Sequence, residues 1–272
     1  MRVSRIARVR VIRVALAASV VAAGLLVTPS PASAEEEQQA DFAFGWPRWS
    51  VAIRGVGLRA RAEGDFYDYV QEHLFARQSP NDDPVNPAAG HLNFNAPGIA
   101  FHVGYAVTPR LDARIGVDYF QAFQPSEMRH FVGSDGLPIE QETTLAQAGL
   151  GGSITLALLP RGQAIGNYVW IPARVVPYVG VGAGMTRYKL TQVGEFVDFV
   201  DGALFTAQVL STGWAGTTRL IAGADVRLST SVATTIEISH IRGSGQLMEV
   251  FEGFDPIDLS GLRIGAGIRV AF

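Results

Sequence analysis

The last fourteen residues, Leu259 to Phe272, alternate between two kinds of side chain. From Gly261 to Arg269 the odd positions hold only glycine or arginine. The even positions are apolar: Leu262, Ile264, Ala266, Ile268, Val270 and Phe272. A period of two places successive side chains on opposite faces of an extended chain. The pattern therefore predicts a β-strand with one apolar face and one bare or cationic face.

Similar alternation recurs along the chain. The clearest example is a pair of segments, 97–107 and 111–123, joined by the tight turn Thr108-Pro109-Arg110. Each has an apolar face opposite a face that carries the polar residues. In all, the pattern predicts eight strands, at 49–62, 97–107, 111–123, 142–158, 175–190, 211–228, 232–241 and 259–272.

The connections between these strands alternate in length. Long polar segments follow the first, third, fifth and seventh strands, at 63–95, 124–140, 191–210 and 242–258, whereas the other connections are short or medium. Within the first, Tyr67–Arg77 is compatible with one or two helical turns, and within the third, Ala203–Leu210 is compatible with an extension of the next strand beyond the membrane. Short turns on one side and long loops on the other are the rule for bacterial outer-membrane barrels. We therefore expect an all-β fold, an eight-stranded antiparallel up-and-down transmembrane β-barrel with long extracellular loops and both termini periplasmic.

The first 34 residues have a different character. Five arginines precede an apolar run from Val14 to Val27, and Ala32-Ser33-Ala34 supplies a small-residue cleavage motif. These features are typical of a cleaved secretory signal, and the run is short for a membrane-spanning helix of about 20 residues. We expect three segments: a cleaved signal peptide at 1–34, a short periplasmic lead at 35–48, and an outer-membrane β-barrel at 49–272.

Charge and composition exclude several classes of function. Without the signal, the chain keeps 17 basic and 25 acidic residues, a net charge of −8. This balance argues against nucleic acid as a partner. The chain has no cysteine, which excludes disulfides and thiolate metal sites. No segment after residue 34 has 18 consecutive apolar residues, so no transmembrane helix is predicted there.

Alternation alone leaves open which face points inward. A soluble lipocalin-like barrel would turn its apolar face inward, whereas a membrane barrel turns that face to lipid. We favour the membrane barrel, because Tyr178 and Tyr188 are ten residues apart, about 25 Å along a tilted strand, which matches the spacing of two aromatic girdles. The predicted girdle residues are Trp49, Tyr105, Tyr119, Tyr178, Tyr188 and Trp214.

In a membrane barrel the charged strand residues face the lumen. This luminal charge network is predicted to comprise Arg54, Asp112, Arg114, Asp118, Arg187, Lys189, Arg219, Asp225, Arg227, Glu237, Arg263 and Arg269. Eight of these are basic and four acidic. The interior of an eight-stranded barrel is just wide enough for side chains to fill, and buried charges need partners. We expect a closed or narrow lumen, filled by Arg, Asp and Glu.

Three segments carry a resemblance to a known family. The closing GAGIRVAF is similar to the carboxy-terminal insertion signal of bacterial outer-membrane barrels, although Gly265 stands where a polar residue is usual. VTPRLDARIGVDY and VPYVGVGAGM resemble the outer-membrane β-barrel domain superfamily that includes outer-membrane proteins A, X and W. The similarity spans Trp49 to Phe272 and is specific for architecture rather than activity.

The resemblance implies a route to the membrane and a set of partners. It implies periplasmic chaperones and insertion by the barrel assembly machinery, with Gly267, Val270 and Phe272 as the assembly signal. It also implies a cell outer-membrane location, contact with outer-membrane lipid and lipopolysaccharide, and a monomer. We also predict no cofactor and no metal site.

Three functions remain open. The first is a non-enzymatic barrel that supports envelope integrity or surface interaction. Its main surface would be 63–95, and its loop acids, which suggest at most weak cation binding, are Asp82, Asp83, Asp198, Asp201 and Glu252. The second is a narrow channel for small or apolar solutes, which the resemblance to outer-membrane protein W suggests.

The third function is a lipid A-modifying enzyme, because lipid A deacylases are barrels that use Ser, His and Glu. In the segment SHIRGSG, Ser239, His240 and Ser244 lie close to Glu237. A strand places Ser239 and His240 on opposite faces, however, and the His-x-Ser spacing of that family is absent because Arg242 occupies the position. We therefore predict no catalytic residues.

Overall fold

The computed structural model describes residues 43–76, 93–166, 169–198, 200–248 and 251–272. The expected signal peptide and most of the expected periplasmic lead lie outside these residues. No helix in the described part of the chain is both long and apolar enough to cross a membrane.

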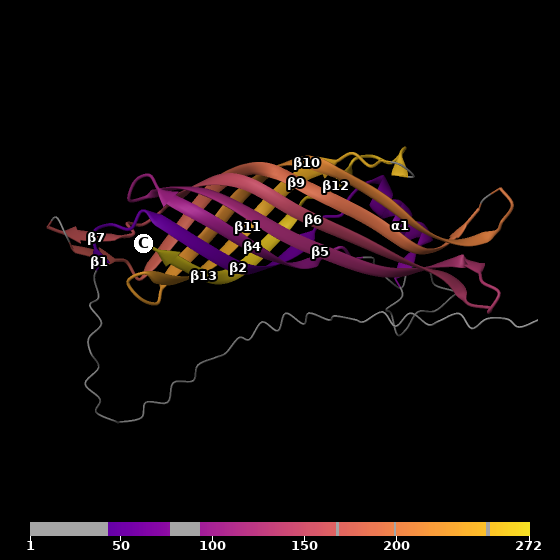
Figure 1. Ribbon diagram of the computed structural model, residues 1–272, viewed down its shortest axis with the longest axis horizontal. Coiled ribbons are helices and arrows are strands. Elements are labelled where there is room, and N and C mark those ends of the chain that lie inside the picture. The colour runs from indigo at the N-terminus through magenta and orange to yellow at the C-terminus, as the bar shows by residue number, and fades with distance from the viewer. Residues whose placement is uncertain (1–42, 77–92, 167–168, 199, 249–250) are drawn as a thin grey trace, which may run out of the picture. The chain divides into compact units, whose positions relative to one another are not determined.

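Eight antiparallel strands form a closed ring (Figure 1). In the order in which they pair, they are β2 (Trp49–Ala60), β4 (Ala96–Ala106), β5 (Leu111–Val132), β6 (Pro138–Ala157), β9 (Val175–Val197), β10 (Leu204–Arg227), β11 (Val232–Gly245) and β13 (Gly261–Ala271). Strand β13 returns to pair with β2, and the backbones of Trp49 and Phe272 exchange two hydrogen bonds of 2.9 Å. Each strand pairs with its sequence neighbour, and the last pairs with the first, so the predicted eight-stranded up-and-down barrel is confirmed.

The outward face of the ring is apolar. Large side chains at the middle of the strands are more than half exposed, including Ile115 (64%), Leu220 (62%) and Leu150 (57%). The buried set contains the charges, including Asp112 at 0% and Arg263 at 3%. A soluble protein rarely exposes an apolar patch larger than a few hundred Å². An apolar exterior around a charged interior is the pattern of a transmembrane barrel.

The structure corrects the lengths of two predicted loops. Segments 124–140 and 191–210 are mostly strand, and the turns that remain are 133–137 and 198–203. The hairpins β5–β6 and β9–β10 therefore extend past the rest of the sheet, at the end where α1 lies (Figure 1). These extensions carry polar residues on both faces, so hydropathy gives no strand signal, but the strand pairing continues along them. The side-chain amide of Gln192 also donates to the side-chain amide oxygen of Gln141 at 2.7 Å.

Short elements complete the two ends of the barrel. At the end that holds the carboxy-terminus, β1 (Ala43–Phe44), β7 (Gly162–Ile165) and β8 (Val169–Pro172) form a three-stranded sheet, where the sequence predicted only a turn. At the opposite end lie α1 (Asp65–His73), β3 (Phe75–Ala76), which pairs with β5, and β12 (Ile257–Asp258), which pairs with β11.

Helix α1 begins after Gly64, whose φ of 113° suits glycine. Asp65 and Asp68 lie in its first turn, where the helix dipole favours negative charge. Its buried residues are Phe66, Tyr67 and Val70, which share one face. The helical turns expected around Tyr67 are therefore present, and the helix packs by its apolar face.

Candidate functional site: the barrel lumen

Ion pairs fill the lumen in three layers, the first near the end that holds both barrel termini. This layer is built on Asp112, which is completely buried. Its carboxylate pairs with Arg161, with Arg269 at 3.0 Å and with Arg114 at 3.6 Å. Arg269 also pairs with Asp225 at 2.5 Å. One buried carboxylate thus contacts guanidinium groups from its own strand β5, from the segment before β7 and from β13.

The middle layer is built on Glu237 of β11. Its carboxylate pairs with Arg54 and lies 3.5 Å from Arg114, and it accepts a hydrogen bond of 3.0 Å from the hydroxyl of Tyr178. The guanidinium of Arg114 also lies over the Tyr178 ring, 4.4 Å from its centre. The arginine is therefore held by a carboxylate and an aromatic face together.

The third layer is built on Asp118 of β5. Its carboxylate pairs with Arg219 at 2.8 Å and with Arg263 at 3.0 Å. The guanidinium of Arg263 stacks on Phe120, 4.4 Å from the ring centre. Phe120 belongs to the apolar part of the lumen, so this contact joins the charged layers to what lies beyond them.

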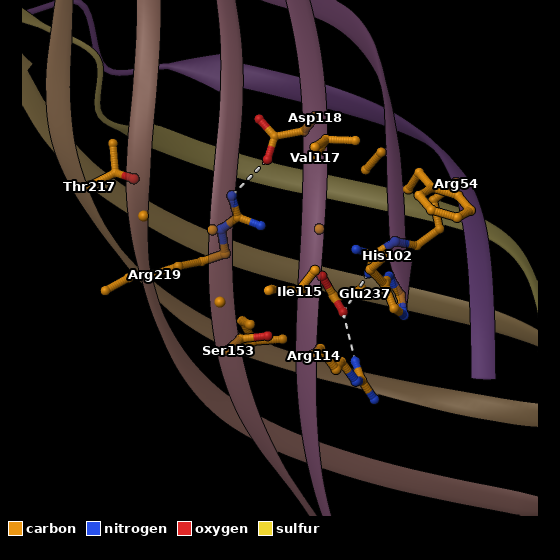
Figure 2. A pocket seen from close by; sticks show the side chains of 18 residues that line it. Arg54, His102, Arg114, Ile115, Val117, Asp118, Ser153, Thr217, Arg219 and Glu237 are labelled. Atoms are coloured by element: carbon orange, nitrogen blue, oxygen red, sulfur yellow. Dashed lines mark hydrogen bonds and ion pairs between the residues drawn. The ribbon is translucent and has the colours of Figure 1, made fainter. Parts of the chain in front are cut away.

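A small cavity lies between the middle and third layers (Figure 2). Its volume is about 40 Å³, and its polar lining includes Arg54, His102, Asp118 and Glu237. Such a volume accommodates only a few water molecules. The lining includes buried polar atoms that no protein group satisfies, among them Nε of Arg54 and Nε2 of His102. The space suits hydration of the ion pairs, and it is too small for a solute path.

Beyond the charged layers lies a cluster of buried apolar residues, here called the apolar cap. The barrel contributes Phe120, Leu145, Tyr188 and Leu190, α1 contributes Phe66, Tyr67 and Val70, and the segment before β13 contributes Phe251, Ile257 and Leu259. Phe66 meets Phe251 edge-on at 5.8 Å, and Tyr67 meets Phe94 at 5.1 Å. The cap was not foreseen, because its members come from separate segments and carry no shared motif.

One polar group is anchored inside the cap. The hydroxyl of Tyr67 donates a hydrogen bond of 2.8 Å to the backbone oxygen of Asp258. Burial, followed by the negative charge of Asp258, raises the pKa of this phenol above its ordinary value. The phenol therefore stays neutral and fixes α1 to the segment that leads into β13.

Ten of the twelve predicted luminal charges lie on the inner face. They are Arg54, Asp112, Arg114, Asp118, Arg219, Asp225, Arg227, Glu237, Arg263 and Arg269. Arg161, which precedes β7, reaches in from outside the eight strands and was missed. No strand periodicity marks it, so only its contact with Asp112 reveals the role.

The other two predicted charges were assigned to the wrong face. On β9 the structure places Arg187 and Lys189 outward and buries Tyr178 (2%) and Tyr188 (1%) inside. The sequence prediction followed the ten-residue spacing of the tyrosines and so inverted the strand. The bulky apolar residues Val179, Val181 and Met185 alternate with glycines, and these bulky residues, rather than the tyrosines, mark the lipid face.

Small residues make room for the buried tyrosines. A Cβ at Gly245 would overlap the ring of Tyr188, and one at Gly213 would overlap its hydroxyl. Tyr188 donates a hydrogen bond to the backbone oxygen of Gln246. The glycines of β10 and β11 thus form the space that Tyr188 fills inside the barrel.

The four other predicted girdle residues lie on the outer face. Trp49 is 50% exposed, and its ring centre lies 4.9 Å from that of Tyr105 near the carboxy-terminus. Tyr119 (45%) and Trp214 (59%) are exposed farther along the barrel. Two groups of outward aromatics therefore remain after the correction on β9.

The predicted assembly-signal residues have distinct surroundings. Val270 and Phe272 are on the exposed face, with 36% and 66% of their surfaces accessible. Gly267 faces inward, where a Cβ would overlap the carbonyl oxygen of Ile53. The glycine is therefore required by the packing of β13 against β2.

The alternative chemical sites do not assemble. Ser239 is buried inside and His240 lies outward on the same strand, so they do not meet. Asp198 and Asp201 accept hydrogen bonds of 2.8 Å from Val200 and Ala203 in their own turn. Within the described residues, no group of three or more His, Asp or Glu is placed to hold a metal. Asp82 and Asp83 lie outside the described residues.

Comparisons with known proteins give structural matches alone. No family model and no curated protein matches the chain. Neisserial surface protein A (NspA) is 12% identical over 82% of this chain and 97% of its own, with a TM-score of 0.43. The outer membrane protein OprG from Pseudomonas aeruginosa is 10% identical over 85% and 98%, with a TM-score of 0.46. The attachment invasion locus protein Ail of Yersinia pestis is 13% identical over 82% and 99%, with a TM-score of 0.34.

Such low identities and TM-scores carry no argument about function. The fold rests on the strand order and the sorting of the two faces described above. The solved structures that match are small outer-membrane β-barrel proteins, and it is this kind of protein that the chain resembles.

Proposed function

We propose that the protein is a non-enzymatic outer-membrane β-barrel with a closed lumen, which serves envelope integrity or surface interaction and has both termini in the periplasm. The observation that supports the proposal is the presence of three ion-pair layers and an apolar cap inside the ring of eight strands. Side chains rather than solvent occupy the interior, as the diameter of an eight-stranded barrel favours.

The two long hairpins support a role at the cell surface. Their ends extend to Val132 and Leu204, and they carry exposed apolar side chains: Val132 (54%), Leu137 (61%), Val200 (95%) and Phe205 (48%). The rings of Phe196 and Phe205 stack at 6.0 Å across β9 and β10. Rigid strands that carry apolar groups away from the membrane are suited to contact with another macromolecule.

The orientation is tested by labelling single cysteines on intact cells, since the chain has none of its own. Leu137→Cys lies at a hairpin end and Arg110→Cys at a short turn near the termini; both native side chains are exposed. A membrane-impermeant maleimide should label the first variant on intact cells and the second only after the outer membrane is opened. The reverse pattern would overturn the orientation.

Closure is tested by planar-bilayer recording of the purified, refolded barrel. The expected result is no resolvable ion current. A steady current would instead support the alternative, a narrow channel for small or apolar solutes. Outer-membrane fractionation and heat-modifiable migration on a gel provide the control that the protein measured is a folded membrane barrel.

A further inference from the structure

The charges of the eight strands sort between the two faces of the barrel. Within the first fifteen residues of each strand, counted from the end that holds the termini, all four acids face inward: Asp112, Asp118, Asp225 and Glu237. Four cations in the same stretches face outward: Arg59, Arg187, Lys189 and Arg242. The lipid-facing surface of these stretches therefore carries positive charge and no negative charge.

The outward cations lie at a common height on the barrel. Arg59 follows the start of β2 by ten residues, Arg242 follows the start of β11 by ten, and Arg187 and Lys189 follow the start of β9 by twelve and fourteen. Strand rise and tilt convert these counts to about 25 to 35 Å from the end that holds the termini. The apolar band of an outer-membrane barrel is about 25 Å tall. The cations therefore lie at the far edge of the hydrocarbon layer.

The pair on β9 lies beside an apolar hollow. Strand register places Tyr119, Ala148, Arg187 and Trp214 in one row across four adjacent strands, and places Ala146 beside Lys189 in the next. Of the two alanines, Ala148 lines the hollow, together with Tyr119, Arg187 and Trp214 of the same row. The hollow has a volume of about 420 Å³ and a mainly apolar lining that includes Ile99, Phe101 and Leu150.

The two cations have no other role in the described structure. Neither Arg187 nor Lys189 forms an ion pair with a described residue, and both side chains are exposed. Among the described residues of β6 and β9, the outward acids nearest to this pair are Glu142 on β6, four residues along the ladder from the row of Lys189, and Glu140 on β6 and Glu195 on β9, each six residues from it. An outward charge at the membrane is costly unless it meets the headgroup region or a counter-ion.

We propose that this surface binds lipid A, with its phosphates on Arg187 and Lys189 and an acyl chain in the hollow over Ala148. The choice of lipid rests on the proposed orientation, which places this end of the barrel in the outer leaflet. Lipid A joins phosphates and several acyl chains in one molecule, so it matches two neighbouring cations above an apolar hollow. The guanidinium of Arg187 favours phosphate geometrically, because it offers two parallel donors.

The test uses native mass spectrometry of the purified, folded full barrel with lipid A bearing two phosphates. The comparison lipids are dephosphorylated lipid A and phosphatidylglycerol. Wild type should retain the phosphorylated lipid A at least about tenfold better than either, and the double variant Arg187→Gln/Lys189→Gln should lose that preference. Arg110→Gln is the matched control, because it removes an exposed arginine at the opposite end.

A second variant addresses the hollow independently of charge. Ala148→Phe fills its floor, and it should weaken retention of the acylated lipid while leaving the two cations in place. Equal retention of lipid A by wild type and the Arg187/Lys189 variant would overturn the proposal. Equal retention of phosphatidylglycerol and lipid A by wild type would overturn the choice of lipid.

The result is separable from the proposed function. The same variants are examined for outer-membrane fractionation, heat-modifiable migration and cysteine labelling at Leu137. A barrel that is correctly placed and oriented, but that shows no preference for phosphorylated lipid A, would overturn the lipid site alone. A barrel labelled in the reverse orientation would overturn the proposed function first.

Discussion

At the scale of single residues, the lumen depends more on its acids than on its arginines. Six inward or inward-reaching arginines pair with four carboxylates, and Asp112 alone contacts Arg114, Arg161 and Arg269. Loss of any one arginine leaves Asp112, Asp118 and Glu237 each with another arginine partner. Loss of Asp112 leaves several buried cations without their shared counter-charge, which is the costly way to break an ion pair.

We therefore expect Asp112→Asn to destabilise the folded barrel by about 3 to 5 kcal/mol, because the amide cannot neutralise the guanidinium groups around it. The measurement is urea unfolding of the barrel in lipid vesicles, followed by tryptophan fluorescence. Glu63→Gln is the control: it removes an equivalent charge from the exposed pair with Arg61, and no measurable change is expected. Equal effects of the two substitutions would show that the luminal network contributes no special stability.

The sequence predicted which strand charges enter the lumen better than it predicted their partners. Alternation decides the face of Arg54 or Asp118 locally, within a few residues. The pairs themselves join distant segments: Arg114 and Glu237 are 123 positions apart, and Arg269 and Asp112 are 157. Such pairs depend on strand register and on the stagger of the closed barrel, which local patterns do not encode.

At the scale of the elements, β9 shows how a correct period can receive the wrong phase. The strand alternates as predicted, but the sequence allows either set of positions to face the lipid. One set holds the tyrosines and glycines, and the other holds valines, a methionine and two cations. The structure turns the second set outward. The large apolar side chains of the membrane-spanning part of β9 face lipid. The two cations that follow them reach the membrane interface, as long cationic side chains do.

Single cysteines on β9 distinguish the two phases directly. Met185→Cys and Arg187→Cys should react readily with a lipid-soluble maleimide in bilayers, whereas Thr186→Cys, at a site only 2% exposed, should react at least about tenfold more slowly. Thr186 and cysteine are close in size, so the inward variant keeps the packing. Faster reaction at position 186 than at its two neighbours would restore the phase expected from the tyrosine spacing.

The long hairpins show a different limit of sequence patterns. In the membrane, one face of each strand must be apolar, and the period is visible. In the extensions, polar side chains occupy inward positions too: Gln124, Ser126 and Gln141 are buried, and they give no apolar period although they lie in continuous strands. The sequence pattern of the membrane-spanning part therefore predicted that each strand exists. It did not predict how far the strands of the two long hairpins extend beyond the membrane.

At the scale of the whole molecule, the proposed closure of the lumen has two parts, and each part depends on different physics. The charged layers near the termini resist opening because separated ions would lose their partners in a low-dielectric interior. The apolar cap near α1 resists opening because its aromatic residues would be exposed to water. The charged layers and the apolar cap meet where Arg263 stacks on Phe120, but otherwise they are built from different residues.

Independent closures predict a conditional result. Phe66→Ala/Val70→Ala removes the main anchors of α1 in the cap, and Arg54→Ala/Arg114→Ala/Glu237→Ala truncates the middle charged layer. We expect each variant alone to remain without resolvable current in a planar bilayer, because the other closure is intact. The variant that combines all five substitutions should conduct ions. Its truncated side chains leave space both in the middle charged layer and in the apolar cap, where side chains otherwise fill the lumen.

The five-substitution variant must be compared with the cap variant Phe66→Ala/Val70→Ala and with the charged-layer variant Arg54→Ala/Arg114→Ala/Glu237→Ala. Heat-modifiable migration on a gel identifies the folded form of each. A steady current through the cap variant alone would mean that the charged layers admit ions, and that α1 is the real barrier. A current through the charged-layer variant alone would mean that the apolar cap is permeable. Both results would contradict double closure, because each closure is expected to be sufficient on its own.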